Sequence, residues 1–254
     1  MQEYAVFYRN LIIFVYFQFI YICFMNKKER HSILLRELEN QKRLNLVEFS
    51  RYLGVSDDTI RRDMNELDSK GLLKKVHGGA ISRSSLPTDF HVRGDYSRNE
   101  KARLAGKAVA HIKNGDVIII DGGTTNLEVV KKIPIDFSGT VFTNSLPLAG
   151  MMCNYPGVKL IFLGGLILKE SQVTVGHEVI SALEDFTADV YFMGVHAVHS
   201  ELGISVPDHE EAMVKKAMAR NAEKVIVLPI AEKLNTASTY RICSTDDVIL
   251  IKAD

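Results

Sequence analysis

Four side chains that form strong hydrogen bonds lie within one short stretch of the sequence, namely Ser56, Thr59, Arg61 and Arg62. Arginine can pair with guanine through two hydrogen bonds, and serine or threonine hydroxyls can contact a base edge or a phosphate. These contacts need one rigid element that presents the side chains together. The stretch therefore predicts a helix that contacts nucleic acid.

A second group of donors follows shortly afterwards and consists of Lys74, Lys75 and His77. Such groups suit phosphate oxygens, which supply affinity without base preference. The next two residues, Gly78-Gly79, are a tight-turn signal between two short runs that can pair as a hairpin over Leu72 to Ser82.

The flanking residues predict the helices that must position these groups. Leu46 to Val55 has an apolar stripe, and Gly54 stands where that helix must stop, because glycine tolerates a left-handed C-terminal cap. Ser56 is placed as the N-cap of the next helix, whose first turn carries two aspartates at its positive end. Apolar residues then recur at helical spacing, at Ile60, Met64 and Leu67.

Two helices joined by a short turn with glycine, followed by a hairpin, form a winged helix-turn-helix. An earlier helix over Lys27 to Asn40 would close a small three-helix core. We therefore predict an α+β winged helix-turn-helix DNA-binding domain over residues 26–83. A basic pair alone is more often a solvated helix face, but here cap, turn glycine and basic hairpin coincide.

Charge is distributed unevenly along a chain that is neutral overall at pH 7. Residues 26–83 hold 13 Lys and Arg against 9 Asp and Glu, whereas residues 84–254 hold 17 against 21. The positive excess coincides with the predicted DNA-binding domain. Because it is modest, we expect tight binding to need a homo-oligomer, such as a dimer or tetramer.

After a polar segment at 84–96, which is predicted as a linker, helical patterns alternate with short apolar runs rich in β-branched residues. This alternation predicts an α/β, Rossmann-like domain over residues 97–254, with a mostly parallel sheet covered on both faces. The predicted strands are 117–120, 141–142, 158–163, 190–193, 225–228 and 248–251, and the clearest helices are 100–112 and 209–221.

Small and hydroxyl-bearing residues follow several of these strands, where parallel sheets bind ligands. Asp121-Gly122-Gly123-Thr124-Thr125 leads from the first strand into a helix, so that glycines, free N–H groups and two hydroxyls could cradle a phosphate. The same residues also suit an ordinary strand-to-helix turn. A P-loop lysine and a dinucleotide fingerprint are both missing, so nucleotide binding is not supported. Thr143-Asn144-Ser145 and Gly164-Gly165 end the next two strands.

The chain resembles the DeoR-type bacterial repressors over nearly all of residues 26–254. In the first domain the resemblance rests on Arg30, Leu34, Leu38, on Ser56 with Thr59 to Met64, and on Val76 to Ala80. In the second it rests on Glu100-Lys101, Asp121 to Thr125, Thr143 to Ser145, Gly164-Gly165, Glu211-Ala212 and Lys233.

The resemblance implies a sensor domain of the ribose-phosphate isomerase fold that has lost catalysis and responds to a phosphorylated sugar or related metabolite. By the same resemblance Lys101, Thr124 and Thr125 would hold a phosphate, with Lys233 on the other side of the ligand. The full set expected to contact the effector is Lys101, Asp121, Gly123, Thr124, Thr125, Asn144, Ser145, Gly165, Glu211 and Lys233.

Two segments depart from the family pattern at the expected pocket rim. Val195-His196-Ala197 stands where many members have an acidic or small residue, and Pro229-Ile230-Ala231 replaces a turn that often contains aspartate. These departures leave the identity of the sugar open and weaken an isomerase reading, which needs a carboxylate base. We interpret His196 and His199 as structural histidines rather than ligand donors.

The N-terminal residues 1–25 form an apolar extension rich in Phe, Tyr and Ile. We interpret it as a start codon assigned too early, with Met25 as the natural beginning. A membrane anchor is the alternative, although a helix over Leu11 to Met25 would be short of the hydrocarbon core. Cys23, Cys153 and Cys243 have no metal-binding spacing, so we expect reduced thiols, no metal and no cofactor.

The sequence therefore predicts a cytoplasmic regulator, most plainly a repressor of a carbohydrate-catabolism operon. Its partners would be a double-stranded DNA operator and a small phosphorylated metabolite effector. The alternatives are a sugar-phosphate isomerase-like enzyme with a DNA-binding appendage, for which Asp121 and Glu211 are the only plausible carboxylates, and a membrane-tethered regulator.

Overall fold

The computed structural model describes residues 25–253, so nearly all of the predicted N-terminal extension lies outside the described residues. Within the described part, no helix has the length and apolar character needed to cross a membrane. Contacts divide the chain into two units, one ending at Arg83 and the other beginning at Ser84.

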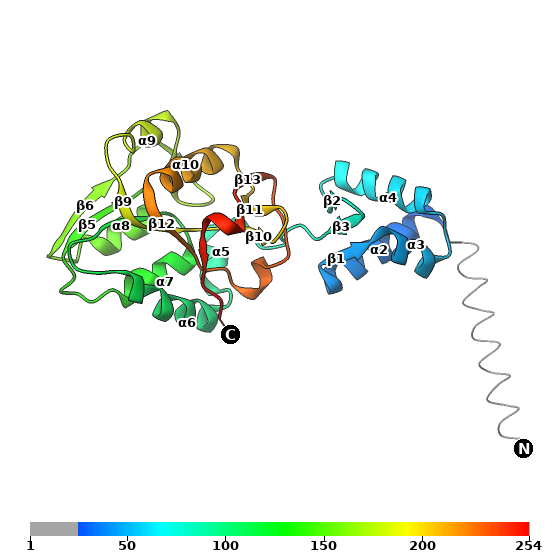
Figure 1. Cartoon of the computed structure of the whole chain (residues 1–254), viewed down its shortest axis with the longest axis horizontal. Coiled ribbons are helices and arrows are strands. Elements are labelled where there is room, and N and C mark those ends of the chain that lie inside the picture. The colour runs from blue at the N-terminus through cyan, green and yellow to red at the C-terminus, as the bar shows by residue number, and fades with distance from the viewer. Residues whose placement is uncertain (1–24, 254) are drawn as a thin grey trace, which may run out of the picture. The chain divides into compact units, whose positions relative to one another are not determined.

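Three helices form the core of the first unit: α2 (Lys27–Gln41), α3 (Leu46–Leu53) and α4 (Asp57–Ser69) (Figure 1). Asparagine or serine side chains cap all three at their N-termini, as the local sequence favours. Gly54 ends α3 with a φ of 62°, in the left-handed region. The buried apolar residues include Leu34, Leu38, Ile60, Met64 and Leu67.

A small antiparallel sheet completes this unit, in the order β1-β3-β2. The predicted hairpin is β2 (Lys74–Val76) and β3 (Gly79–Ile81), whereas β1 (Arg43–Asn45) was not predicted because only one of its residues, Leu44, is buried. Gly78 has a φ of +75°, and a Cβ on Gly79 would lie 1.9 Å from the Leu44 carbonyl oxygen. Both turn glycines are therefore needed, the first for its conformation and the second for the close approach of β1.

The second unit is built on a parallel six-stranded sheet in the order β14-β12-β9-β4-β5-β6. All six predicted strands are present. They are β4 (Val117–Ile120), β5 (Gly139–Thr143), β6 (Val158–Phe162), β9 (Ala188–Met193), β12 (Ala222–Val227) and β14 (Ile249–Leu250).

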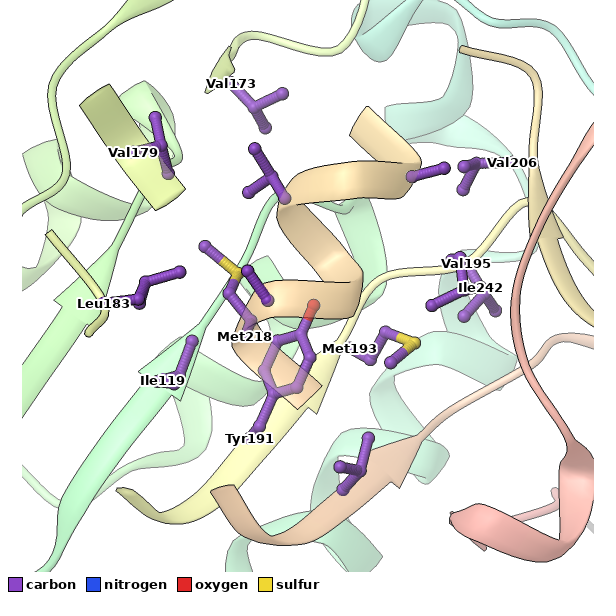
Figure 2. Close-up of a cluster of buried hydrophobic side chains, with 14 of the residues drawn as sticks. Ile119, Val173, Val179, Leu183, Tyr191, Met193, Val195, Val206, Met218 and Ile242 are labelled. Carbon is purple, nitrogen blue, oxygen red and sulfur yellow. The ribbon is translucent and has the colours of Figure 1, made fainter. Parts of the chain in front are cut away.

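Helices cover both faces of this sheet, on opposite sides in Figure 1. One face packs against α6 (Arg98–Ala108), α7 (Thr124–Lys132) and α8 (Leu146–Met152), and the other against α9 (His177–Ser181) and α10 (His209–Arg220). Side chains alternate between the faces, since Ile118 and Ile120 join one core and Ile119 joins the other. Figure 2 shows the second of these cores gathered around α10.

Short elements that the sequence did not predict follow the carboxyl ends of β6, β9 and β12. Two small antiparallel sheets consist of β7 (Leu166–Leu168) with β8 (Val173–Val175), and of β10 (Ala197–His199), β11 (Gly203–Val206) and β13 (Tyr240–Cys243). The 3₁₀ turn η2 (Ala231–Lys233) follows β12. Two others lie elsewhere: η1 (Val109–His111) continues α6 within the predicted helix 100–112, and η3 (Thr245–Asp247) precedes β14.

The segment 84–96, which the sequence indicated as a linker, packs on the second unit. It contains the short helix α5 (Phe90–Asp95), and Leu86 and Phe90 are buried. The Phe90 N–H donates to the Glu170 carbonyl at 2.8 Å, and the Ser84 N–H donates to the Ala237 carbonyl at 3.1 Å. Two apolar side chains in an otherwise polar stretch are enough to hold it against the core.

Candidate functional site

The N-terminal turn of α4 presents the polar side chains that the sequence singled out. Ser56 caps the helix, because its Oγ accepts the Thr59 N–H at 3.2 Å and lies 2.9 Å from Thr59 Oγ1. Arg61 and Arg62 are exposed on the next turn. Among the described residues Arg61 pairs with Asp58 alone, at 2.7 Å on the surface, and such an exposed pair is easily exchanged for a base or phosphate.

A buried ion pair fixes the position of α4 against α2. Asp63 is 3% exposed and accepts hydrogen bonds from Arg30 Nε at 2.8 Å and Arg30 Nη2 at 3.3 Å, while His31 Nε2 lies 3.1 Å away. Two bonds from one guanidinium define the angle between the helices as well as their distance. Asp63 therefore positions the exposed face of α4 and does not belong to it.

The basic hairpin lies beside the same helix. Lys75 Nζ donates a hydrogen bond to Asn65 Oδ1 on α4, Lys74 is half-buried, and His77 is exposed at the turn. The structure thus brings the two predicted donor groups onto one domain, where a helix and a wing could contact one duplex.

The second unit has a pocket above the carboxyl ends of β4 and β9. The two strands approach so closely that a Cβ on Gly194 would lie 2.0 Å from the Gly122 carbonyl oxygen. The pocket walls also include Gly123, His196 and Glu211. Of the residues expected to contact an effector, Gly123 and Glu211 therefore line the cavity directly, and Thr124 and Thr125 follow Gly123 in the chain.

Asp121 lies buried beneath these glycines. Its oxygens accept hydrogen bonds from the Tyr191 hydroxyl, Lys215 Nζ at 2.6 Å, Asn126 Nδ2 at 3.1 Å and the Gly194 N–H. Four donors from the chain satisfy this carboxylate, which suits a positioning role, and the contact with an effector that the sequence suggested stays a prediction.

Lys215 links this carboxylate to the pocket wall. Its Nζ also lies 3.3 Å from Glu211 Oε1, one helical turn earlier on α10, and Glu211 Oε2 accepts from Ser171 Oγ at 3.3 Å. Burial lowers the pKa of Lys215, but the two carboxylates more than offset this and hold the pKa above its ordinary value. The sequence predicted Glu211 as an effector contact but not Lys215, although the i, i+4 spacing places both on one face of the helix.

The N-terminus of α7 meets the pocket without a side-chain cap. Its first two side chains, Thr124 and Thr125, are 7% and 6% exposed. Thr125 Oγ1 has no hydrogen-bond partner among residues 25–253, which is costly for a buried hydroxyl unless a ligand supplies one. The helix dipole and the free N–H groups favour an anion at this place.

Three cationic side chains in this part of the unit have no carboxylate ion pair among the described residues. Arg93 lines the pocket, whereas Lys101 and Lys233 are buried and are not among its lining residues. Lys101 Nζ donates to the Arg93 carbonyl and Lys233 Nζ to the Val195 carbonyl, while Arg93 Nε donates to the Asp89 carbonyl at 3.4 Å. Burial, followed by the charges of Arg93 and Lys101, lowers the pKa of Lys233 to about 7. Burial and the charge of Arg93 also lower the pKa of Lys101.

Arg93 and Thr88 line the pocket but come from the segment predicted as a linker. Sequence reasoning missed them because a single arginine in a polar stretch carries no periodic or spacing signal. His196 also lines the pocket, and burial, Lys233 and Arg93 lower its pKa to about 4, so its imidazole is neutral at pH 7.

Asn144, Ser145 and Gly165 lie around β8, apart from the residues that line the pocket. Asn144 Nδ2 donates to the Thr174 carbonyl at 2.7 Å, and a Cβ on Gly165 would lie 2.7 Å from the Val175 carbonyl oxygen. Asn144 Oδ1 and Ser145 Oγ are buried without a partner among the described residues. Their predicted contact with an effector stays a prediction.

Comparison with known proteins assigns a family to both units. Residues 30–86 match the model of the DeoR-like helix-turn-helix domain, and residues 97–254 match that of the DeoR C terminal sensor domain.

Curated relatives match over most of their length. The HTH-type transcriptional repressor GlcR of Bacillus subtilis is 32% identical over 91% of this chain and 89% of its own. The HTH-type transcriptional regulator GlpR of Haloferax volcanii is 31% identical over 81% of each chain, and the glycerol-3-phosphate regulon repressor of Escherichia coli is 28% identical over 80% of this chain and 81% of its own.

Among solved structures, ribose 5-phosphate isomerase A from Methanocaldococcus jannaschii is 18% identical over 53% of each chain, with a TM-score of 0.39. That likeness is too weak to bear on function. Two domain models that together span most of the chain, and full-length relatives above 30% identity, are sufficient: the chain belongs to the DeoR family of transcriptional regulators.

Proposed function

We propose that the chain is a repressor of a carbohydrate-catabolism operon, released or recruited by a small phosphorylated metabolite in its second unit. The names of relatives support this class, since they include a putative aga operon transcriptional repressor and a glycerol-3-phosphate regulon repressor, both of Escherichia coli. The departures at His196 and Ile230 leave the particular metabolite open.

The effector class is supported mainly by three cations, Arg93, Lys101 and Lys233, whose charges act on one another and which have no carboxylate ion pair in the part of the chain described. Burying like charges together costs free energy unless an anion joins them. Glu211 is the one carboxylate in the pocket walls and already pairs with Lys215. The local balance is therefore positive and suits a phosphate dianion.

The rest of the pocket suits a hydroxylated carbon chain attached to that phosphate. The phosphate would accept hydrogen bonds from Thr125 Oγ1 and from the free N–H groups of α7. Glu211 and Ser171 would accept hydroxyl protons of a sugar or polyol at the opposite wall. The charged residues would supply the affinity for the phosphate, and the polar wall would select the sugar or polyol.

In the first unit we propose that Ser56, Thr59, Arg61 and Arg62 contact the operator through its major groove. Lys74, Lys75 and His77 would contact phosphates of the backbone. Two copies of the chain would place two such heads on repeated half-sites. Effector binding would then shift the balance between arrangements that differ in DNA affinity.

We propose that the pocket binds without catalysing a reaction. An isomerase needs a free carboxylate or histidine base near the substrate. Asp121 is occupied by four donors, Glu211 is paired with Lys215, and burial with the charges of Lys233 and Arg93 lowers the pKa of His196 to about 4, which makes its imidazole a weak base. Turnover of pentose or hexose phosphates that is lost in Asp121→Asn would contradict this proposal.

The decisive experiment is a gel shift with DNA from upstream of the gene's own operon, repeated with a panel of sugar and polyol phosphates. We expect a retarded band whose midpoint changes with at least one phosphorylated compound and with none of the matching unphosphorylated ones. Thr125→Val should keep the band and lose the response. Absence of any shift at low salt would refute the DNA-binding part of the proposal.

A further inference from the structure

The segment 84–96 forms part of the effector pocket while leading directly to the DNA-binding unit. Thr88 and Arg93 line the cavity. Ser84, the first residue of the segment, directly follows Arg83, the last residue of the DNA-binding unit. Ser84 Oγ donates to the His196 carbonyl at 3.2 Å, so the first residue of the second unit is bonded to a pocket residue. We call residues 84–96 the strap.

Two buried apolar side chains and several hydrogen bonds, among them that from Lys101 Nζ to the Arg93 carbonyl, hold the strap to the body of the second unit. Its apolar contacts come from Leu86 and Phe90, while Val92 and Tyr96 are 55% and 43% exposed. Gln172 Nε2 and His91 Nε2 lie 2.7 Å apart at an exposed position. Ser97, the residue after the strap, has a φ of 48°, a left-handed conformation that a non-glycine residue seldom adopts.

The charge of Arg93 opposes this attachment when the pocket is free of an anion. Arg93 is half-buried, and its guanidinium forms no ion pair within residues 25–253. The negative charges of Glu211 and Asp89 stabilise it without an ion-pair contact. Lys101 and Lys233 belong to the body of the unit, and their charges repel that of Arg93. An anion bound between Arg93 and the two lysines would attract both the strap and the body of the unit, and so replace their repulsion.

We propose that Arg93 is an effector ligand carried by the strap, and that an anion bridging Arg93 to Lys233 and Lys101 fixes the strap on the second unit. This rests on the proposed phosphorylated effector, and it names the element through which that effector would reach the DNA-binding unit. The free energy of effector binding that fixes the strap can act on the DNA-binding unit, because the strap continues directly into that unit at Arg83.

Hydrogen–deuterium exchange of the full chain tests the inference, with inorganic phosphate and glycerol 3-phosphate as probes and glycerol as the uncharged control. We expect peptides within 84–96 to exchange about threefold or more slowly with either phosphorylated probe, because local opening becomes costlier. Glycerol should leave them unchanged. Thermal unfolding in the same buffers reports independently whether each probe binds.

Arg93→Gln removes the charge with little change in size, and Arg103→Gln, at an exposed position on α6, is the matched control. Loss of one charge-assisted contact should weaken phosphate binding about tenfold and abolish the protection of the strap. Arg93→Lys should restore part of the affinity. Circular dichroism confirms that the variants fold.

The outcomes separate the two proposals. If a phosphorylated probe binds but the exchange of 84–96 is unchanged, the strap inference fails and the proposed effector class stands. If Arg93→Gln binds phosphate as tightly as Arg103→Gln, Arg93 is not a ligand and the inference fails. If no phosphorylated probe binds at millimolar concentration, the proposed effector class fails and takes the inference with it.

Discussion

Lys215 Nζ lies 2.6 Å from Asp121 Oδ2, and the exposed fractions of the two side chains are 3% and 1%. The pair joins α10, which carries the pocket carboxylate Glu211, to the glycine turn after β4. Because Asp121 also accepts from the Gly194 N–H and the Tyr191 hydroxyl, one ion pair holds the floor of the pocket in place. This relationship gives the first prediction.

Lys215→Met should lower the free energy of unfolding by about 3–5 kcal/mol, because it leaves the Asp121 charge buried without its partner. Urea unfolding measures the loss. The double variant Asp121→Asn, Lys215→Met should recover part of it, since the uncompensated charge is then gone. Equal stability of Lys215→Met and the unaltered protein would contradict a charged, structural pair.

Removal of either exposed arginine of α4 should change base preference. Arg61→Ala or Arg62→Ala is expected to cost about 1–3 kcal/mol of binding free energy and to relax the preference at one base pair, if that side chain reads guanine. Fluorescence anisotropy with single-base variants of the operator measures this. Arg36→Ala, an exposed arginine on α2, is the control. Unchanged preference in both variants would show that α4 is not the recognition helix.

Removal of the wing lysine should act differently. Lys75→Ala is expected to weaken binding to all sequences alike and to reduce the slope of affinity against salt by about one unit, because a phosphate contact releases counterions. Titrations at several salt concentrations measure the slope. A loss confined to the specific operator would instead assign Lys75 to base recognition.

Two buried threonines should respond oppositely to the same isosteric change. Thr125→Val removes a hydroxyl without a partner in the described chain and should leave stability equal or higher by about 1 kcal/mol, while effector binding is lost. Thr174 Oγ1 donates to the Leu163 carbonyl, so Thr174→Val should lower stability by about 1–3 kcal/mol. Urea unfolding and ligand titration together separate the two roles. A stability loss in Thr125→Val would assign its hydroxyl to the fold.

Lys233 should make stability and effector affinity depend on pH. Its pKa is lowered to about 7 in the folded chain by burial, Arg93, Lys101 and Lys215. Between pH 7 and the ordinary lysine pKa the unfolded chain binds the extra proton, so this group makes the free energy of unfolding rise with pH. Effector affinity should fall over pH 7 to 9, because the anion requires the charged form and phosphate is already dianionic there.

Lys233→Met removes both dependences and tests this sign. Without effector it should be more stable than the unaltered protein at pH 6 by about 1–3 kcal/mol, since a buried charge without a carboxylate partner in the described part of the chain is gone. Thermal unfolding across pH 6 to 9, with Lys132→Met on the exposed end of α7 as control, measures the difference. A flat pH profile in the unaltered protein would mean that Lys233 keeps an ordinary pKa.

The sequence alone determined the elements whose signals are local. The Ser56 cap, the Gly54 stop and the spacing of Ile60, Met64 and Leu67 lie within one or two helical turns, and α4 forms where they predicted it. The six core strands could be predicted equally well, because a strand buried on both faces is apolar along its whole length. Family membership followed from the same local motifs.

Only the tertiary structure determined which residues that are distant in the sequence lie in contact. Asp121 and Lys215 are 94 positions apart and Arg30 and Asp63 are 33 apart, so neither pair left a spacing signal. The sequence did not indicate the role of Arg93 for the same reason. A mostly polar segment is predicted as a linker, and only the fold shows that Leu86 and Phe90 are buried against the second unit. Hydrogen bonds and charges act over a few ångströms in space, whereas a sequence pattern records only neighbours along the chain.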